Sequence, residues 1–486
     1  MEKARPIGHN VLILTIGAFI GSLAYAILGL LIARVVGPVG YGEYVLAFTI
    51  AYTFTYGFML GMDIIIPREL AQDPSILSSL LPSVIIPATI WSILLVLLIY
   101  SFGYLLHYSR EVLSLLLFSA PIVALQALTN LIRAIYRGME RMQLDALSQA
   151  VNGVLVLLLG GSVLLLTHSI LGTTVAYLVS LMLGIFISLY LAFRLAHGKK
   201  IYNHQLIRRI LTASLPLGVA VIIAQSGQNI TMLILGKYVS TQGVGFYGAA
   251  LGCALMLRPL HMAYSSAFLP RLSAQAIISK NTPLTSHENG LRFALMLGVP
   301  IGIATTMLAP LLITILYGKQ YIEGSQALRL LGMEVIFLFI NTYLWQVFTA
   351  LGKEKTVLVI ACISILIAVG LSFLLTPHFG IIGTAIADLS REGVQMILFL
   401  TVLRYRWKTL SIKPQNIFSI GIASLILVVC LWAVRLNSSL ISLLFLAGGM
   451  IVYGMVLFLC GAIKKNELSS LIPSRWMVLL KRRESK

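Results

Sequence analysis

The sequence predicts an all-helical integral membrane protein with many membrane-crossing segments, and three observations lead to this fold class. Hydrophobic residues make up 59% of the 486 residues and charged residues only 10%, whereas an average soluble domain has about 25% charged residues. Apolar windows of roughly 20 residues, the length that a helix needs to cross a bilayer, recur along the whole chain. The third observation is the placement of Lys and Arg between these windows. No segment shows the alternating polarity of a membrane β-barrel, so we expect a helical bundle.

Reading the apolar windows in chain order gives fourteen predicted spans. The spans lie near 10–33, 44–66, 82–106, 112–136, 147–167, 170–194, 210–236, 244–269, 290–316, 326–350, 356–376, 380–403, 416–434 and 439–462. The first window follows a short basic segment and imitates a signal peptide. Its apolar run continues to Ala33, which is too long for the core of a signal peptide. We therefore interpret it as an uncleaved first span.

The basic residues test this number of spans, because Lys and Arg concentrate in the cytoplasmic segments of membrane proteins. With a cytoplasmic N-terminus, most of the 35 Lys and Arg residues fall in cytoplasmic stretches. The exceptions on the outer side are Arg34, Arg110, Lys237, Lys319, Arg329 and Arg435. The pattern predicts fourteen spans in the cytoplasmic membrane with both termini cytoplasmic. The net charge of +19 then reflects topology and affinity for anionic headgroups, and not binding to nucleic acid.

An internal repeat is the most specific signal in the chain. Residues 30–71 align without a gap on residues 233–274, an offset of 203 positions. Eleven of the 42 positions are identical, and in the first copy these are Leu30, Val36, Gly40, Gly42, Tyr44, Ala47, Ala51, Met59, Pro67, Arg68 and Ala71. A second, gapped echo pairs Gly138-Met139-Glu140-Arg141 with Gly352-Lys353-Glu354-Lys355, and Gly172-Thr173 with Gly383-Thr384. Shared Gly and Pro-Arg positions at one fixed offset indicate a duplicated unit.

The duplicated unit holds six spans, so both copies enter the membrane in the same direction. Parallel repeats are related by an axis along the membrane normal and place the substrate between the two lobes. We expect an N-terminal lobe at 1–196, a C-terminal lobe at 197–408, two accessory spans within 409–462 and a cytoplasmic interfacial tail at 463–486. This organisation is typical of an alternating-access transporter.

Three segments resemble a known family of transporters. They are ARVVGPVGYGEYVLAF at 33–48, GMDIIIPRELA at 61–71 and RGMERM at 137–142. They resemble the Wzx-type polysaccharide flippases of the multidrug/oligosaccharidyl-lipid/polysaccharide exporter superfamily, which also contains the MurJ lipid II flippases and the MATE drug exporters. The resemblance covers the whole chain in span number, two-lobe repeat and short loops.

The resemblance implies a MATE/MurJ-like fold and a biosynthetic role. It implies a flippase that moves a sugar chain on a polyprenyl (di)phosphate from the cytoplasmic to the outer leaflet, for cell-surface polysaccharide. Membrane lipids would be partners, together with a polysaccharide polymerase or glycosyltransferases, and H⁺ or Na⁺ would be a coupling ion.

Two alternatives belong to other functional classes. A MATE-like, ion-coupled exporter of drugs or metabolites is the nearer one, and the balance of acidic and basic residues within the spans does not decide against it. A membrane polymerase or ligase acting on lipid-linked glycans is the other. Such an enzyme needs a catalytic constellation or a sizeable extramembrane loop, and neither is found in the sequence. We therefore expect no enzyme activity and no cofactor.

The four cysteines do not predict a metal site or a disulfide framework. Cys253, Cys362, Cys430 and Cys460 all fall within spans and have no paired spacing. We interpret them as small apolar residues that fill space between helices.

Cationic side chains within or near the spans are candidates for binding the phosphate of a lipid-linked substrate, since ionisable groups are rare and costly in a membrane. Arg258 lies near the middle of the eighth span and is the principal candidate, because guanidinium offers paired donors to phosphate. Arg34 and Lys237 are related by the repeat at the outer ends of their spans. Arg133 and Arg391 are the other two candidates for phosphate binding.

Each cation also has a purely structural interpretation. Arg258 could pair with a carboxylate such as Glu334 and fix helix packing. Arg34 and Lys237 could extend to the lipid headgroups. Arg133 lies near the inner face, where the positive-inside rule alone accounts for it.

Acidic residues within the spans are candidates for ion coupling, because burial of a carboxylate favours its protonation. The candidates are Glu334, Asp388, Glu392 and Asp63. Asp388 and Glu392 share one helix face with Arg391, so mutual neutralisation is the alternative. The uncharged polar residues Gln225, Gln228, Asn229 and Asn341 are predicted to line the central cavity.

Overall fold

The computed structural model describes residues 7–196, 201–225, 227–261, 264, 286–407, 414–434 and 439–460. Helices dominate these residues, and no strand occurs among them. Within these described ranges, ten helical stretches are long and apolar enough to cross a membrane by length and composition. Two of the ten, Ile13–Gln72 and Glu354–Tyr405, each hold two of the predicted spans. The predicted fold class, an all-helical protein with many membrane spans, is therefore confirmed.

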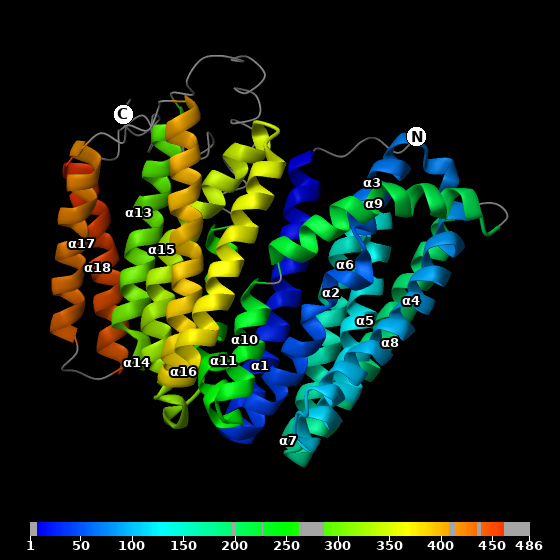
Figure 1. Cartoon of the computed structure of the whole chain (residues 1–486), viewed down its shortest axis with the longest axis horizontal. Coiled ribbons are helices and arrows are strands. Elements are labelled where there is room, and N and C mark those ends of the chain that lie inside the picture. The colour runs from blue at the N-terminus through cyan, green and yellow to red at the C-terminus, as the bar shows by residue number, and fades with distance from the viewer. Residues whose placement is uncertain are drawn as a thin grey trace, which may run out of the picture. The chain divides into compact units, whose positions relative to one another are not determined.

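The first six predicted spans are formed by α1 to α8 (Figure 1). The bounds are α1 Ile7–Thr53, α2 Thr55–Met59, α3 Met62–Gln72, α4 Leu77–Leu105, α5 Arg110–Gly138, α6 Met142–Leu155, α7 Gly161–Thr167 and α8 Ile170–Leu195. A π-helical stretch, Val156–Gly160, joins α6 to α7 and makes one span of them. Within α1, Gly37 has a φ of 73° and precedes Pro38. Since a left-handed glycine and a proline both interrupt a helix, the first two spans turn there.

The remaining predicted spans follow the same plan. The bounds are α9 His204–Gln225, α10 Gly227–Tyr238, α11 Thr241–Leu255, α13 Ser286–Met307, α14 Ala309–Leu316, α15 Gly324–Ala350, α16 Glu354–Trp407, α17 Pro414–Val434 and α18 Ser439–Leu459. The long α16 contains a second left-handed glycine, Gly380, with a φ of 56°, and the eleventh and twelfth spans meet there. Residues 262–263, 265–269 and 463–486, which complete the predicted eighth span and the tail, lie outside the described residues.

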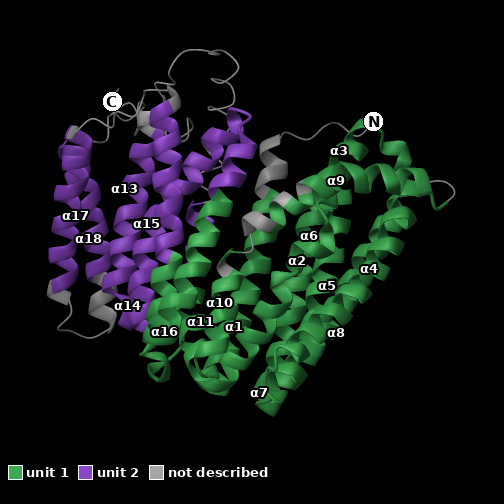
Figure 2. Cartoon of the chain, viewed as in Figure 1, with its two compact units in different colours: residues 1–252, 313–324, 361–388 green, residues 253–312, 325–360, 389–486 purple. Residues whose placement is uncertain are grey.

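The chain forms two compact units (Figure 2). Unit 1 contains 1–252, 313–324 and 361–388, and unit 2 contains 253–312, 325–360 and 389–486. Unit 1 thus combines the first copy of the repeat with the first part of the second copy. The boundaries of the two six-span lobes remain a prediction.

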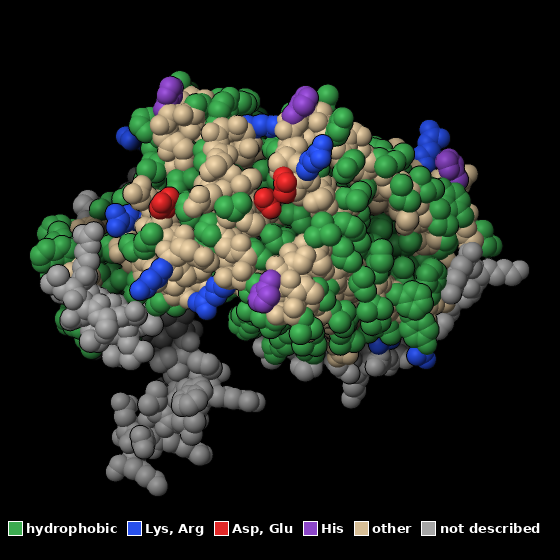
Figure 3. Space-filling view, turned by 90° about the horizontal axis from the view of Figure 1, so that it is seen from below, with side chains coloured by type: hydrophobic (Ala, Val, Ile, Leu, Met, Phe, Trp, Pro, Cys, Tyr) green, Lys and Arg blue, Asp and Glu red, His purple; other side chains and the backbone are tan. Residues whose placement is uncertain are grey.

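Large apolar side chains are exposed along the outer helices of unit 1. On α4 they include Ile86, Ile90, Ile93, Leu94, Leu97 and Leu98, and on α8 they include Val179, Met182, Leu183, Phe186, Ile187 and Tyr190. Exposed apolar surface of this extent suits contact with lipid rather than water. On the face shown in Figure 3, scattered Lys, Arg and His side chains and a few acidic ones interrupt the hydrophobic side chains.

Glycines permit close packing between α1 and α6. An added methyl group at Gly17 or Gly21 of α1 would overlap the backbone of Ala146 or Gln149 of α6, and one at Gly153 would overlap Gly21. Small residues four apart let the backbones of two membrane helices approach closely. The helices α1 and α6 therefore pack closely at these positions through the complementary shapes of their surfaces.

In unit 1, α1 and α11 contact each other through equivalent positions of the internal repeat. A methyl group on Gly42 would overlap the carbonyl oxygen of Thr241, and one on Gly245 would overlap the carbonyl oxygen of Pro38. Gly42 and Gly245 are related by the offset of 203, and so are Pro38 and Thr241. The two copies therefore meet through equivalent residues in a reciprocal contact, which explains why both glycines are retained.

We expect Gly245→Ala to destabilise the protein, because the added methyl group must displace backbone atoms, and overpacking of this kind costs about 1–3 kcal/mol. The control is Gly29→Ala, where an added methyl group meets nothing within 4 Å. That change should be neutral or stabilising, since Ala favours a helix over Gly by about 1 kcal/mol. Thermal unfolding of the purified variants in detergent measures both. Equal melting temperatures would contradict the reciprocal contact.

Candidate functional site

A cationic cluster lies in unit 1, where the end of α5 meets the start of α6. The carboxylate of Asp145 is buried and accepts from Arg133 Nε at 2.6 Å and from Arg137 Nη1 at 3.2 Å. Gln149 Nε2 donates to the same carboxylate at 3.0 Å, and Arg133 Nη1 donates to Asn130 Oδ1 at 2.8 Å. The arginine side chains are 21% and 33% exposed. Two guanidiniums share one carboxylate, so the cluster carries a net positive charge on a partly accessible surface.

A hydrogen-bonded tyrosine network lies next to this cluster along α5. Tyr52 OH donates to Gln126 Oε1 at 3.0 Å, and Gln126 Nε2 donates to Tyr177 OH at 2.7 Å. The amide of Gln126 thereby links α1 to α8. The sequence makes Gln126 visible as a polar residue in the middle of an apolar window, whereas Tyr52 and Tyr177 were not among the predicted site residues.

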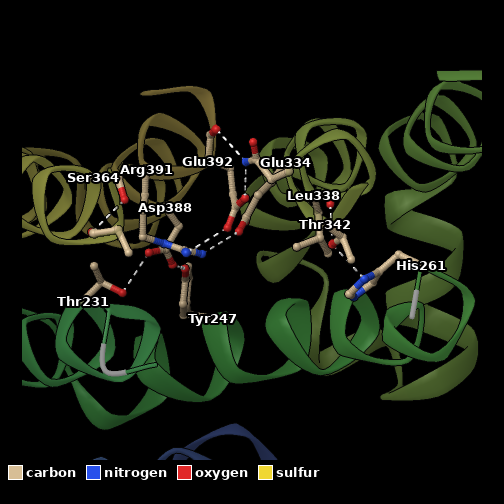
Figure 4. Close-up of polar contacts among 12 residues, drawn as sticks. Thr231, Tyr247, His261, Glu334, Leu338, Thr342, Ser364, Asp388, Arg391 and Glu392 are labelled. Atoms are coloured by element: carbon tan, nitrogen blue, oxygen red, sulfur yellow. Dashed lines mark hydrogen bonds and ion pairs between the residues drawn. The ribbon is translucent and has the colours of Figure 1, made fainter. Parts of the chain in front are cut away.

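A buried carboxylate in unit 1 belongs to Asp388 of α16. Its oxygens accept from Thr231 Oγ1 at 2.9 Å and, in a second short hydrogen bond, from the hydroxyl of Tyr247 (Figure 4). Tyr247 is one of the repeat-identical residues. Both of these groups are neutral hydroxyls, and they donate to the buried carboxylate as expected for a buried polar group.

In unit 2, Arg391 lies between two carboxylates. Its Nη2 is 3.2 Å from Glu334 Oε1, and its Nη1 is 2.8 Å from Glu392 Oε1 (Figure 4). Asn341 Nδ2 donates to Glu392 Oε2 at 2.6 Å and to the Glu392 carbonyl oxygen at 2.9 Å. The two carboxylates outnumber the guanidinium, so this cluster carries a net negative charge. Four of the predicted site residues, Arg391, Glu334, Glu392 and Asn341, are therefore brought together.

Arg258, the principal phosphate candidate from the sequence, belongs to unit 2. Its side chain is exposed and follows the turn that ends α11. The neighbouring His261 is buried, its Nδ1 lies 3.1 Å from Thr342 Oγ1, and its ring meets Phe339 edge-on. Within the described part of the chain, Arg258 has no ion pair with Glu334, whose partner is Arg391.

Arg34 and Lys237, both of unit 1, hold the ends of helices. Arg34 Nε donates to the Leu316 carbonyl oxygen at 2.9 Å, and its Nη2 donates to the carbonyl of Ile315, at the end of α14. Lys237 donates to the carbonyl of Leu106 at the end of α4. Cations are favoured at these termini, where carbonyl groups lack helical partners. The repeat-related Arg34 and Lys237 thus both bind carbonyl groups at helix ends.

The ammonium of Lys237 also lies over an aromatic ring. Its Nζ is 3.9 Å from the centroid of Tyr108, in the short connection between α4 and α5. Burial raises the pKa of Tyr108 to about 12, so the phenol is neutral at physiological pH and offers only its ring to the cation. Lys237 thus contacts both the carbonyl group of Leu106 and the ring of Tyr108.

The remaining predicted residues are separate from these clusters. Asp63 is in the first turn of α3, after the left-handed Gly61, where an acidic side chain complements the helix dipole. Asn229 is partly exposed on α10. The side chains of Gln225 and Gln228 lie outside the described residues.

Sequence reasoning missed two residues that organise these clusters. Asp145 lies just before the predicted fifth span, and an acidic residue between Arg141 and that span is a signal that could have revealed a partner for Arg133. Tyr247 was visible as a repeat identity, but its bond to Asp388 joins residues 141 positions apart, which no local pattern discloses.

Comparison with known proteins gives a family and several relatives. The polysaccharide biosynthesis protein family matches residues 7–275. The capsular polysaccharide biosynthesis protein CapF of Staphylococcus aureus is 21% identical over 276 residues, which are 54% of this chain and 68% of CapF. The probable flippase AglR of Haloferax volcanii is 28% identical over 232 residues, 46% of this chain. The match spans about half the length of AglR, at 48%.

Solved structures of transporters share the fold. The lipid II flippase MurJ in an inward closed conformation has a TM-score of 0.75 and 18% identity, covering 92% of this chain and 99% of MurJ. An inward-facing multidrug resistance transporter of the MATE family has a TM-score of 0.63 and 16% identity, covering 83% and 100%. At these identities the likeness establishes the fold alone, and it confirms the predicted MATE/MurJ-like arrangement.

Proposed function

Because this chain belongs to the polysaccharide biosynthesis protein family, we propose that it is a flippase that moves a saccharide linked to a polyprenyl (di)phosphate across the cytoplasmic membrane. The observation that carries this proposal is the family match together with two flippases of Haloferax volcanii among the relatives. The MurJ-like fold supports it, since a fold with the same span order serves a lipid II flippase. The chain acts in the biosynthesis of cell-surface polysaccharide.

The proposed transport cycle follows from the repeat. The two six-span lobes rock about the substrate and expose it to one leaflet and then the other. Both termini are cytoplasmic, as the distribution of basic residues favours. The substrate enters where the inner ends of the spans carry most of the Lys and Arg residues.

The two ionic clusters have different proposed roles because their net charges differ. The positive cluster of Arg133, Arg137 and Asp145 receives the phosphate at the inner mouth. The negative cluster of Arg391, Glu334 and Glu392 repels phosphate and suits exchange of H⁺ or Na⁺, with Asp388 as a further acidic group. Arg258, with its exposed guanidinium, is a second contact for the anion during transfer.

The polymerase and ligase alternative is not supported by the relatives, of which two are flippases by name. The drug-exporter alternative has support from the MATE structures, but these share only the fold at 16% identity. We therefore propose a transporter without enzyme activity. A polysaccharide polymerase or glycosyltransferases would act on the same lipid-linked substrate before or after it is moved.

Reconstitution tests this function. Liposomes receive the purified protein and a polyprenyl-diphosphate disaccharide with a fluorophore on the sugar, and a membrane-impermeant reductant then quenches the outer leaflet. We expect quenching to proceed beyond the half reached in protein-free liposomes, because the flippase brings inner-leaflet lipid to the outside. Quenching that stops at half, combined with ion-driven uptake of ethidium by the same liposomes, would reject the flippase in favour of the drug exporter.

A further inference from the structure

An aromatic face runs along the second part of α1 in unit 1. Tyr41, Tyr44, Phe48 and Tyr52 are spaced by three and four residues, so they lie on one side of the helix. The ring centroids are 6.4 Å apart for Tyr41 and Tyr44, 4.4 Å for Tyr44 and Phe48, and 5.9 Å for Phe48 and Tyr52. The rings therefore form a continuous row along the second span.

Neighbouring helices extend this row into a surface. Tyr177 of α8 stacks on Phe48 and on Tyr25, with centroids 5.9 Å apart in both pairs. Gln126 of α5 bonds to the hydroxyls of Tyr52 and Tyr177. The surface thus combines flat rings with hydroxyl and amide groups at their edges, and three helices fix its geometry.

The repeat shows that helix packing alone does not require these rings. In the second copy, at the offset of 203, the row reads Val244, Tyr247, Leu251 and Leu255. Only one ring of four is retained on the same backbone, and the second echo likewise pairs Tyr177 with Asp388. Aliphatic residues therefore fill three of the four equivalent positions of the row, Val244, Leu251 and Leu255. The aromatic row is a specialisation of the first copy.

Part of this surface is accessible at a depth where lipid would not tolerate it. Tyr25, Tyr44, Tyr52 and Gln126 are partly exposed, whereas Tyr41, Phe48 and Tyr177 are buried. Gln126 lies in the middle of the span Arg110–Gly138. A polar group facing hydrocarbon is costly, and the exposed apolar residues of α4 and α8 already provide the lipid-facing side. The aromatic surface therefore suits a water-filled path rather than the bilayer.

We propose that this aromatic surface binds the sugar of the transported lipid-linked saccharide. The inference rests on the proposed flippase function and adds where the sugar is held. The carbon–hydrogen face of a pyranose ring is apolar and flat enough to stack on tyrosine, while its hydroxyls match the phenol and amide groups at the edge. An aromatic side chain with a polar end provides both contacts at a low entropic cost.

The position of the surface relative to the cationic cluster fits such a ligand. Gln126, Asn130 and Arg133 are spaced by four and three residues on one face of α5. Seven residues of helix rise by about 10 Å, so sugar bound at Gln126 lies about one sugar ring and one phosphate away from Arg133. The diphosphate and the first sugar can therefore contact the two sites together.

Binding by two probes separates the sugar contact from the phosphate contact. The probes are farnesyl diphosphate and farnesyl diphosphate with one glucosyl group, titrated against purified full-length protein in detergent by thermophoresis. We expect the glucosylated probe to bind about tenfold more tightly, which corresponds to about 1.4 kcal/mol. Tyr52→Leu, which introduces the residue of the second copy, should remove that preference and leave the affinity for farnesyl diphosphate unchanged.

Two further variants control for structure. Tyr52→Phe keeps the ring and should retain most of the preference for the glucosylated probe. If Tyr52 acted only through its hydrogen bond to Gln126, this variant would lose that preference. Tyr190→Leu changes a tyrosine that is 58% exposed on α8 and should change neither affinity. Equal binding of both probes to the unmodified protein, or a preference that survives Tyr52→Leu, would overturn the sugar site while leaving the flippase intact. Failure of the protein to bind either probe would overturn the proposed function itself.

Discussion

The Arg133→Gln variant is expected to move lipid-linked saccharide at about a tenth of the unmodified rate or less. A hydrogen bond to a charged group contributes about 1.5–3 kcal/mol, and about 1.4 kcal/mol corresponds to a factor of ten. Removal of this guanidinium takes away both the paired donors for phosphate and the net positive charge, because Arg137 and Asp145 then neutralise each other. The liposome quenching assay measures the loss.

The design of this variant keeps the fold intact. Asp145 retains Arg137 at 3.2 Å and Gln149 at 3.0 Å, so no buried carboxylate is left without a partner. Arg194→Gln is the matched control, since Arg194 is another basic residue at the inner end of a span and its exposed guanidinium lies 5.9 Å from the ring centroid of Tyr190. Equal loss of transport in both variants would indicate a general effect of surface charge and contradict a phosphate site at Arg133.

The sequence predicted the fold well because the membrane imposes a simple rule. Every span must be an apolar helix of sufficient length, so composition alone revealed the helices, including the pairs joined at Gly37 and Gly380. The repeat added more, because equivalent residues Gly42 and Gly245 were visible at a fixed offset before their reciprocal contact was known.

The candidate site was less predictable because side-chain partners come from distant parts of the chain. The sequence placed Arg391 beside Asp388 and Glu392, but the bond to Glu334 joins residues 57 positions apart. Arg34 and Lys237 looked alike from the repeat and are indeed used alike, as caps of helices far away in sequence. Their predicted role in substrate binding stays a prediction, and so does that of Arg258.

The largest expected effect on stability comes from Arg391→Met. This change leaves Glu334 and Glu392 buried, at 7% and 3% exposure, without the cation that lies between them. Removal of one partner from a buried ion pair costs about 3–5 kcal/mol, because the remaining charge is uncompensated. We expect a melting temperature well below that of the unmodified protein in detergent, with little expression of the variant in membranes.

Neutralising the carboxylates should restore the thermal stability that Arg391→Met removes. Replacement of a whole buried ionic group by neutral residues is often tolerated, and Asn341 remains as a donor for the side chain at position 392. Arg391→Met combined with Glu334→Gln and Glu392→Gln should therefore melt well above Arg391→Met alone, a coupling that a mutant cycle quantifies. If instead the losses of thermal stability from the single substitutions simply add in the triple variant, the ionic interactions of the cluster do not stabilise unit 2.

The triple variant also tests ion coupling. If it no longer responds to a proton or sodium gradient yet still equilibrates lipid-linked saccharide, these carboxylates couple transport to the ion. A full response to the gradient would place the coupling elsewhere.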